Sequence, residues 1–145
     1  MKILLLGSGG REHALAVKLS QSPLCTKLYI APGNAGTITL GENLSFSGTD
    51  FEAIRQCCEQ QSIDMVVVGP EEPLVKGLVE FLRASASLSN LMIIGPGQMG
   101  AQLEGSKAFA KAFMQRNGIP TAGYREFTAD SFEEGLQYLS SHALP

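Results

Sequence analysis

Residues 2–13, Lys-Ile-Leu-Leu-Leu-Gly-Ser-Gly-Gly-Arg-Glu-His, decide the fold class. An apolar run without polar alternation is typical of a strand buried on both faces, and the glycines that follow permit a tight turn into a helix. The order of apolar run, turn and helical pattern recurs along the chain, as in βαβ units. Four runs are expected to form adjacent parallel strands: residues 2–6, 27–31, 64–69 and 91–94. The sequence therefore predicts an α/β protein with a Rossmann-like parallel sheet.

Helical patterns separate these strands. The first helix is expected from about Arg11 to Gln21, with a buried side made of Ala14, Leu15, Val17 and Leu19. Thr49-x-x-Glu52 is a capping-box pattern and predicts the start of a second helix. A single third helix is expected to begin near Pro73. Its apolar face consists of Leu74, Val75, Leu78, Val79 and Leu82.

The pattern changes beyond Gly97. Residues 98–117 predict one or two helices, residues 124–127 a strand, and Asp130-x-x-Glu133 the start of a last helix. A strand and a helix with no sheet against which to bury their apolar faces do not make a complete domain. We therefore divide the chain into an amino-terminal domain, residues 1–104, and the truncated opening of a second region, residues 105–145.

Composition narrows the class of protein. The formal net charge of −3 argues against a broad polyanion-binding surface, so nucleic acid is not the expected partner. No apolar run reaches the length of a membrane span, and the first run is too short for a signal peptide. The three cysteines show no metal-binding or disulfide spacing. We expect a cytoplasmic protein that binds small molecules, away from membranes.

The glycine-rich turn is the first candidate site. Gly9 and Gly10 let the backbone approach a ligand, and the free N–H groups of a helix start favour an anion. Arg11 can add a charge-assisted hydrogen bond to a phosphate. From these residues alone, a tight turn without a ligand is the alternative.

A nicotinamide-dependent oxidoreductase is the obvious competing interpretation. The dinucleotide-binding fingerprint requires a third glycine where this chain has Glu12, and an acidic residue about 20 positions further on. No acidic residue occurs between Glu12 and Glu42. This interpretation is therefore rejected.

Further candidates follow the second and third strands. In a parallel sheet, ligands bind outside the carboxyl ends of the strands, so the loops at 7–13, 32–36 and 69–73 should share one edge. Asn34 can bind a hydroxyl or an amine, or it can be a turn residue in a left-handed conformation. Glu71 is the acid best placed for a ribose or an amino group, with a structural role as the alternative. His13, one turn into the first helix, is expected to be a packed side chain.

Several segments, in this order, resemble the glycinamide ribonucleotide synthetases (phosphoribosylamine–glycine ligases). The matching stretches are Gly7-Ser8-Gly9-Gly10-Arg11-Glu12-His13, Pro32-Gly33-Asn34-Ala35-Gly36, Gly69-Pro70-Glu71 with Pro73-Leu74, Gly95-Pro96, Glu104-x-Ser106-Lys107 and Gly118-Ile119-Pro120-Thr121-Ala122. The resemblance extends over essentially the whole chain.

The resemblance implies a pre-ATP-grasp domain followed by the start of an ATP-grasp region. It implies that ATP phosphorylates the carboxylate of glycine, and that the amine of 5-phosphoribosylamine attacks the glycyl phosphate, in purine biosynthesis. The residues that would hold phosphoribosylamine are Gly9, Gly10, Arg11, Glu12, Asn34 and Glu71. Lys107 would reach the ATP phosphates. The Mg²⁺ ligands and the rest of the ATP site are expected beyond residue 145.

The chain by itself should be inactive, because most of the expected ATP site is missing from it. The alternative to a ligase is a non-catalytic nucleotide- or metabolite-binding module built on the same Rossmann-like sheet.

Overall fold

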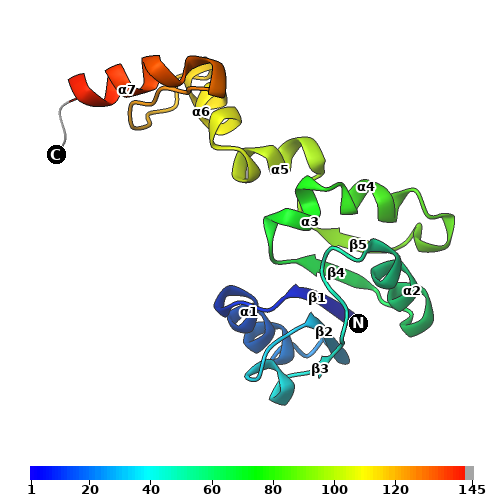
Figure 1. Ribbon diagram of the computed structural model, residues 1–145. Helices are drawn as coiled ribbons and strands as arrows, with labels where there is room; N and C mark the ends of the chain where they lie inside the picture. Colours follow the sequence, from blue (N-terminus) through cyan, green and yellow to red (C-terminus); the bar gives the residue numbers. More distant parts are fainter. Residues whose placement is uncertain (143–145) are drawn as a thin grey trace. The chain divides into compact units, whose positions relative to one another are not determined.

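The computed structural model describes residues 1–142. The chain divides into two compact units, Met1–Gly105 and Ser106–Pro145. The first unit contains β1 (Lys2–Gly7), α1 (Gly10–Ser20), β2 (Lys27–Pro32), the short 3₁₀ turn η1 (Thr37–Thr39), β3 (Glu42–Asn43), α2 (Phe51–Gln61), β4 (Met65–Val68), α3 (Glu71–Val75), α4 (Leu78–Arg83), η2 (Ala86–Leu88), β5 (Met92–Ile94) and α5 (Gln98–Gly105) (Figure 1). The second contains α6 (Lys107–Arg116), η3 (Ala129–Ser131) and α7 (Phe132–Ser141).

The first unit is built on a five-stranded sheet in the order β3-β2-β1-β4-β5. Every neighbouring pair is parallel, which confirms the predicted α/β class and the adjacency of the four predicted strands. β1 lies at the centre, with Gly7 opposite Pro32 of β2 and Leu6 opposite Val68 of β4. β3 was not predicted, because two polar residues carry no periodic signal.

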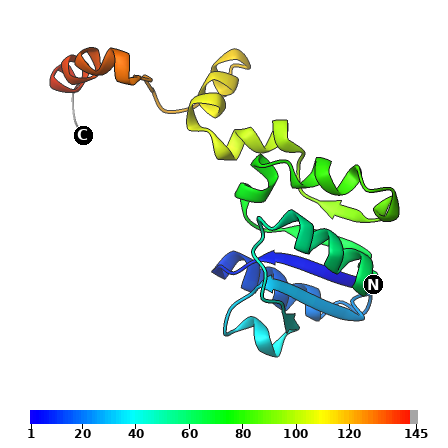
Figure 2. The ribbon, with the colours of Figure 1, turned by 45° about the vertical axis from the view of Figure 1, so that its right-hand side comes forward.

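Successive residues of β1 point to opposite faces of the sheet. Leu4 and Leu6 belong to a core cluster that includes residues of α2, α3, α4 and α5. Ile3 and Leu5 belong to a smaller cluster with Ala16 of α1. In the ribbon, α1 and α2 accordingly lie on opposite faces of the sheet (Figures 1 and 2). Because both faces are covered along β1, its sequence shows no polar alternation.

The predicted buried side of α1 is partly wrong. Ala16 is fully buried, whereas Ala14 is exposed and Leu15 is 37% exposed. The other buried residue of the helix is Glu12, four positions before Ala16 and therefore on the same stripe. The hydrophobic pattern could not find this stripe, because an acidic residue belongs to it.

Two helix boundaries also differ from the prediction. α2 is capped by Asp50, whose carboxylate accepts a hydrogen bond from the Ala53 N–H at 3.0 Å, and not by Thr49. The predicted single third helix is two helices, α3 and α4. They are separated at Gly77, which has φ of +92° and cannot continue a right-handed helix in that conformation. α3 begins at Glu71, so Pro73 is its third residue.

In the second unit, Ser106 caps α6 by accepting a hydrogen bond from the Phe109 N–H at 3.2 Å. The strand predicted at residues 124–127 is wrong. A strand needs a partner for its backbone groups, and residues 106–142 contain no strand. Instead, Phe127 packs beside Gly135 of α7.

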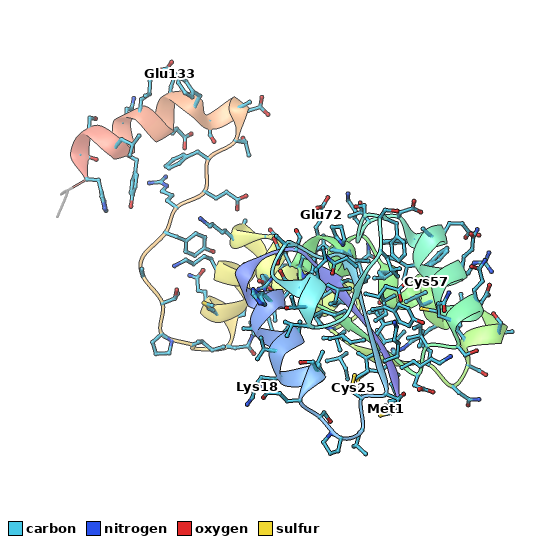
Figure 3. The ribbon with its side chains drawn as sticks, turned by 90° about the horizontal axis from the view of Figure 1, so that it is seen from below. Met1, Lys18, Cys25, Cys57, Glu72 and Glu133 are labelled. Carbon is cyan, nitrogen blue, oxygen red and sulfur yellow. The ribbon has the colours of Figure 1, made fainter. Side chains whose placement is uncertain are left out.

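The direction of the sheet can be followed in Figure 3. Met1, at the start of β1, and Glu72, just after β4, lie at opposite ends of the first unit. Because all strands run the same way, the loops after β1, β2 and β4 open at the end marked by Glu72.

Replacement of Asp50 tests the assignment of the α2 cap. Asp50→Ala should lower the free energy of unfolding by about 1 kcal/mol, because an N-cap hydrogen bond is lost. Thr49→Ala, the matched control, should change it by less than about 0.5 kcal/mol. Urea unfolding of both variants measures this, and a larger loss at Thr49 would contradict the assignment.

Candidate functional site

Three loops meet at the carboxyl edge of the sheet. The Gly33 N–H donates to the Gly7 carbonyl at 3.1 Å, and the side-chain amide of Asn34 donates to the Ser8 carbonyl at 2.9 Å. A guanidinium nitrogen of Arg11 lies 4.0 Å from a carboxylate oxygen of Glu71. The structure thus brings Arg11, Asn34 and Glu71 to the same edge, as the sequence predicted.

The turn from β1 into α1 leaves backbone donors free for a ligand. Gly7 has φ of +128°, a conformation that favours glycine, and Gly9 is the extended N-cap residue. The N–H groups of Gly10 and Arg11 are at the start of the helix and have no acceptor one turn earlier within it. Such N–H groups and the helix dipole favour an anion or another acceptor.

Glu12 lies beneath this turn and is 5% exposed. One carboxylate oxygen accepts a hydrogen bond from the Gly9 N–H at 2.8 Å. The other accepts a hydrogen bond from the Nε–H of Arg11 at 3.0 Å. Gly9 has no side chain to return a bond, so only half of a capping box exists here. Both oxygens of Glu12 are therefore engaged by the protein.

The Arg11 side chain is 55% exposed and faces three carboxylates. Its Nη1 lies 3.6 Å from Glu104, in addition to its contacts with Glu12 and Glu71. The hydrogen bond that Arg11 donates to Glu12 is the main reason that the pKa of Arg11 is raised, and the charges of all three glutamates add to this effect. The cluster is net negative, although the two longer contacts leave the Nη groups able to donate to a ligand.

Asn34 stabilises its own loop through hydrogen bonds. Its side-chain oxygen accepts the N–H groups of Gly36 at 2.8 Å and Thr37 at 3.1 Å. Its own carbonyl accepts the side-chain amide of Asn43 at 2.9 Å. Since φ of Asn34 is not positive, the left-handed turn considered from the sequence is not formed. One hydrogen of its side-chain amide is left for a ligand, because the other is donated to Ser8.

A cavity of about 270 Å³ opens at the same edge. Its lining includes Gly9 and Glu12 from the predicted site, but not Arg11, Asn34 or Glu71. It also includes Ser47, Gly48 and Thr49, which sequence reasoning missed. The sequence did not indicate these residues, because a short polar loop before a helix looks like an ordinary turn. The fold brings this loop to the cavity that the glycine-rich turn also lines.

Lys107 and Lys111 are distinguished by their surroundings in the second unit. Lys111 donates to the Thr121 hydroxyl at 2.8 Å and to the Ala122 carbonyl at 2.7 Å. Lys107 is exposed at the first position of α6, and it forms no hydrogen bond or ion pair with any residue in 1–142. Of the two amines, that of Lys107 is free for a ligand.

His13, Cys57 and Cys58 are packed against neighbouring residues of the first unit. His13 is half-buried and packs beside Gly36, where an added Cβ would lie 2.9 Å from Nδ1 of His13. Burial raises the pKa of Cys57, and it raises the pKa of Cys58 to about 12, so both thiols stay protonated near neutral pH. Within residues 1–142, no group of three or more His, Cys, Asp or Glu side chains could hold a metal ion.

No helix of residues 1–142 is long and apolar enough to cross a membrane.

The parallel sheet and the loops at its carboxyl edge define a Rossmann-like domain of the kind that binds nucleotides or small metabolites. Residues 1–104 match the family described as Phosphoribosylglycinamide synthetase, N domain. The chain belongs to this family.

Named relatives support the assignment. The chain is 48% identical over 147 aligned residues to phosphoribosylamine–glycine ligases from Haemophilus influenzae and from Escherichia coli K12. Each alignment covers 100% of this chain and 33% of the relative, so the chain spans about a third of the length of these proteins.

Solved structures show the same architecture. A phosphoribosylamine–glycine ligase from Thermotoga maritima has a TM-score of 0.65 and 32% identity, covering 94% of this chain and 30% of that chain. An N5-carboxyaminoimidazole ribonucleotide synthetase from Thermus thermophilus also has a TM-score of 0.65, covering 94% of this chain and 36% of that chain. At 22% identity, the second likeness concerns the fold alone.

Two glycines of the site should respond differently to an added methyl group. Gly69→Ala should lower the free energy of unfolding by about 1–3 kcal/mol, because the new Cβ would lie 2.5 Å from Oε1 of the buried Glu12. Gly10→Ala should be neutral or stabilising by up to about 1 kcal/mol, because no atom lies within 4 Å of its added Cβ. Urea unfolding measures the stability of both variants. Equal losses of unfolding free energy in the two variants would contradict the prediction.

Proposed function

We propose that this chain is the phosphoribosylamine-binding part of an ATP-dependent carbon–nitrogen ligase. The ligase joins glycine to 5-phosphoribosylamine and releases glycinamide ribonucleotide, ADP and phosphate. The observation that carries the proposal is the 48% identity to phosphoribosylamine–glycine ligases along the whole chain. The convergence of the glycine-rich turn, Asn34 and Glu71 at one edge supports it.

The reaction suits a site without a nucleophilic side chain. The carboxylate of glycine is a poor electrophile until ATP transfers its terminal phosphoryl group and forms glycyl phosphate. The amine of phosphoribosylamine then attacks the carbonyl carbon, loses a proton and displaces phosphate. Such chemistry depends on positioning and charge stabilisation. We assign this chain the task of positioning the amine substrate.

Each residue at the edge has a role that its surroundings permit. The free N–H groups after Gly9, together with the Nη groups of Arg11, are donors for the phosphate of phosphoribosylamine. Glu71 accepts hydrogen bonds from ribose hydroxyls or from the amine. The free amide hydrogen of Asn34 donates to a sugar oxygen. Because the carboxylates around Arg11 oppose a dianion, directional hydrogen bonds rather than net charge must hold the phosphate.

The opening of the second region is assigned to ATP. We propose a boundary near residues 104–105, with the amino-terminal domain before it and an ATP-grasp region after it. The exposed amine of Lys107 is assigned to the nucleotide phosphates. Mg²⁺ accompanies ATP in such reactions, but the acidic and histidine side chains of residues 1–142 form no group that fits it. No metal ligand is therefore assigned in this chain.

Two substitutions test the substrate site in the full-length ligase. Arg11→Ala should raise the KM for phosphoribosylamine by about 10- to 150-fold, the value of one charge-assisted hydrogen bond. Gly10→Val should raise the same KM, because its side chain would occupy open space on the ligand side and not the core. The KM values for ATP and glycine should stay nearly unchanged. If Gly10→Val and Arg11→Ala both leave the phosphoribosylamine KM unchanged, the site is elsewhere.

A second experiment tests whether this chain can catalyse the reaction without the rest of the ligase. The 145-residue chain alone should form no ADP when mixed with ATP, glycine and phosphoribosylamine, whereas the full-length ligase should. A coupled assay for ADP measures both. Glycine-dependent ADP formation by the 145-residue chain would show that it already holds a complete ATP site, contrary to the proposal.

A further inference from the structure

The slot that holds Glu12 is made by two glycines, one at the end of β1 and one just after β4. An added Cβ at Gly7, the last residue of β1, would lie 2.7 Å from Cδ of Glu12. An added Cβ at Gly69, just after β4, would lie 2.5 Å from Oε1 of Glu12 and 2.8 Å from Cδ. The positive φ of Gly7 already favours glycine, but Gly69 does not share that conformation. Room for the Glu12 side chain is therefore the steric reason for glycine at position 69.

The carboxylate in this slot organises two donors at the substrate edge. It holds the Gly9 N–H at 2.8 Å, which fixes the turn, and Nε of Arg11 at 3.0 Å, which fixes the guanidinium. A buried carboxylate is unfavourable unless it is paired, so Arg11 and Glu12 stabilise each other. Because Glu12 binds Arg11 through Nε, the two Nη groups of Arg11 remain at the exposed end of the fork.

We propose that Glu12 is a positioning residue, which acts on the substrate through Arg11 and the Gly9–Gly10 turn and not by direct contact. This inference rests on the proposed function and replaces the assignment of Glu12 as a substrate ligand. Its burial and its two protein donors support the indirect role. The competing role is direct contact from the wall of the adjacent cavity, which Glu12 lines.

A double-mutant cycle in the full-length ligase separates these roles. Glu12→Gln keeps a side-chain oxygen for the Gly9 N–H but loses the charge that holds Arg11. It should raise the KM for phosphoribosylamine about 10-fold, with the KM values for ATP and glycine within about twofold. In an Arg11→Ala background the same change should add less than about twofold, because its route to the substrate is already removed.

The matched control is Glu52→Gln. Glu52 is also an acidic residue in the first turn of a helix and pairs with an arginine, Arg55, but it does not line the cavity and does not belong to the carboxylates around Arg11. Its replacement should leave every KM unchanged. If Glu12→Gln does not accumulate as folded protein, Gly69→Ala serves as the second variant. It displaces the Glu12 side chain without removing its charge, and it should raise the same KM.

The outcomes are distinct. An unchanged phosphoribosylamine KM in Glu12→Gln, or in Gly69→Ala where that variant replaces it, overturns the inference, even if the thermal stability falls. An equal rise in both Arg11 backgrounds also overturns it, because it indicates direct contact. A wild-type ligase that forms no ADP with glycine and phosphoribosylamine would reject the proposed function, and the inference with it. Normal wild-type activity combined with either of the first two outcomes rejects the inference alone.

Discussion

The parallel register of β1 with its two neighbours is the constraint on which the rest of the first unit depends. Gly7 lies opposite Pro32 and Leu6 lies opposite Val68, so all three strands end at nearly the same level. The loops that follow therefore emerge together, although they are far apart in the sequence. Hydrogen bonds from Gly33 to Gly7 and from Asn34 to Ser8 then join two of these loops directly.

The second organising feature is a buried charge. Glu12 occupies the position at which a helix covering a sheet would usually place an apolar side chain, and glycines of β1 and of the loop after β4 leave space for it. The arrangement gives up apolar packing under the first turn of α1, but Glu12 bonds to both the Gly9 N–H and Arg11 and packs against Gly69 after β4. Rigid placement of donors is what a site needs when its task is to position a substrate.

The acidic surroundings of Arg11 make the charge at this edge negative and not positive. Taken alone, a glycine-rich turn followed by an arginine suggests a phosphate site of positive charge. The structure adds Glu71 and Glu104 at 4.0 and 3.6 Å from the guanidinium, which leaves the cluster net negative. An edge of this kind suits a polar ligand that offers hydroxyl and amine hydrogens as well as a phosphate. Phosphoribosylamine has all three groups.

The α/β class, the four main strands and the edge that carries Arg11, Asn34 and Glu71 could be predicted from the amino-acid sequence alone. These depend on local apolar runs and on the general rule that parallel strands open at one edge. Local patterns were wrong at three places, because two adjacent residues can both serve as caps, a glycine can either continue or end a helix, and a strand needs a partner elsewhere in the chain. Asp50 rather than Thr49 caps α2, Gly77 divides the helix predicted after Pro73, and residues 124–127 form no strand.

Contacts that exist only in the folded chain make Glu12 a buried partner of Arg11, bond Asn34 to its own loop and bring Ser47, Gly48 and Thr49 to the cavity beside the glycine-rich turn. Each of these depends on atoms that the fold brings next to the residue, such as Gly69 beside Glu12 and Asn43 beside Asn34, and the identity of a residue does not reveal them.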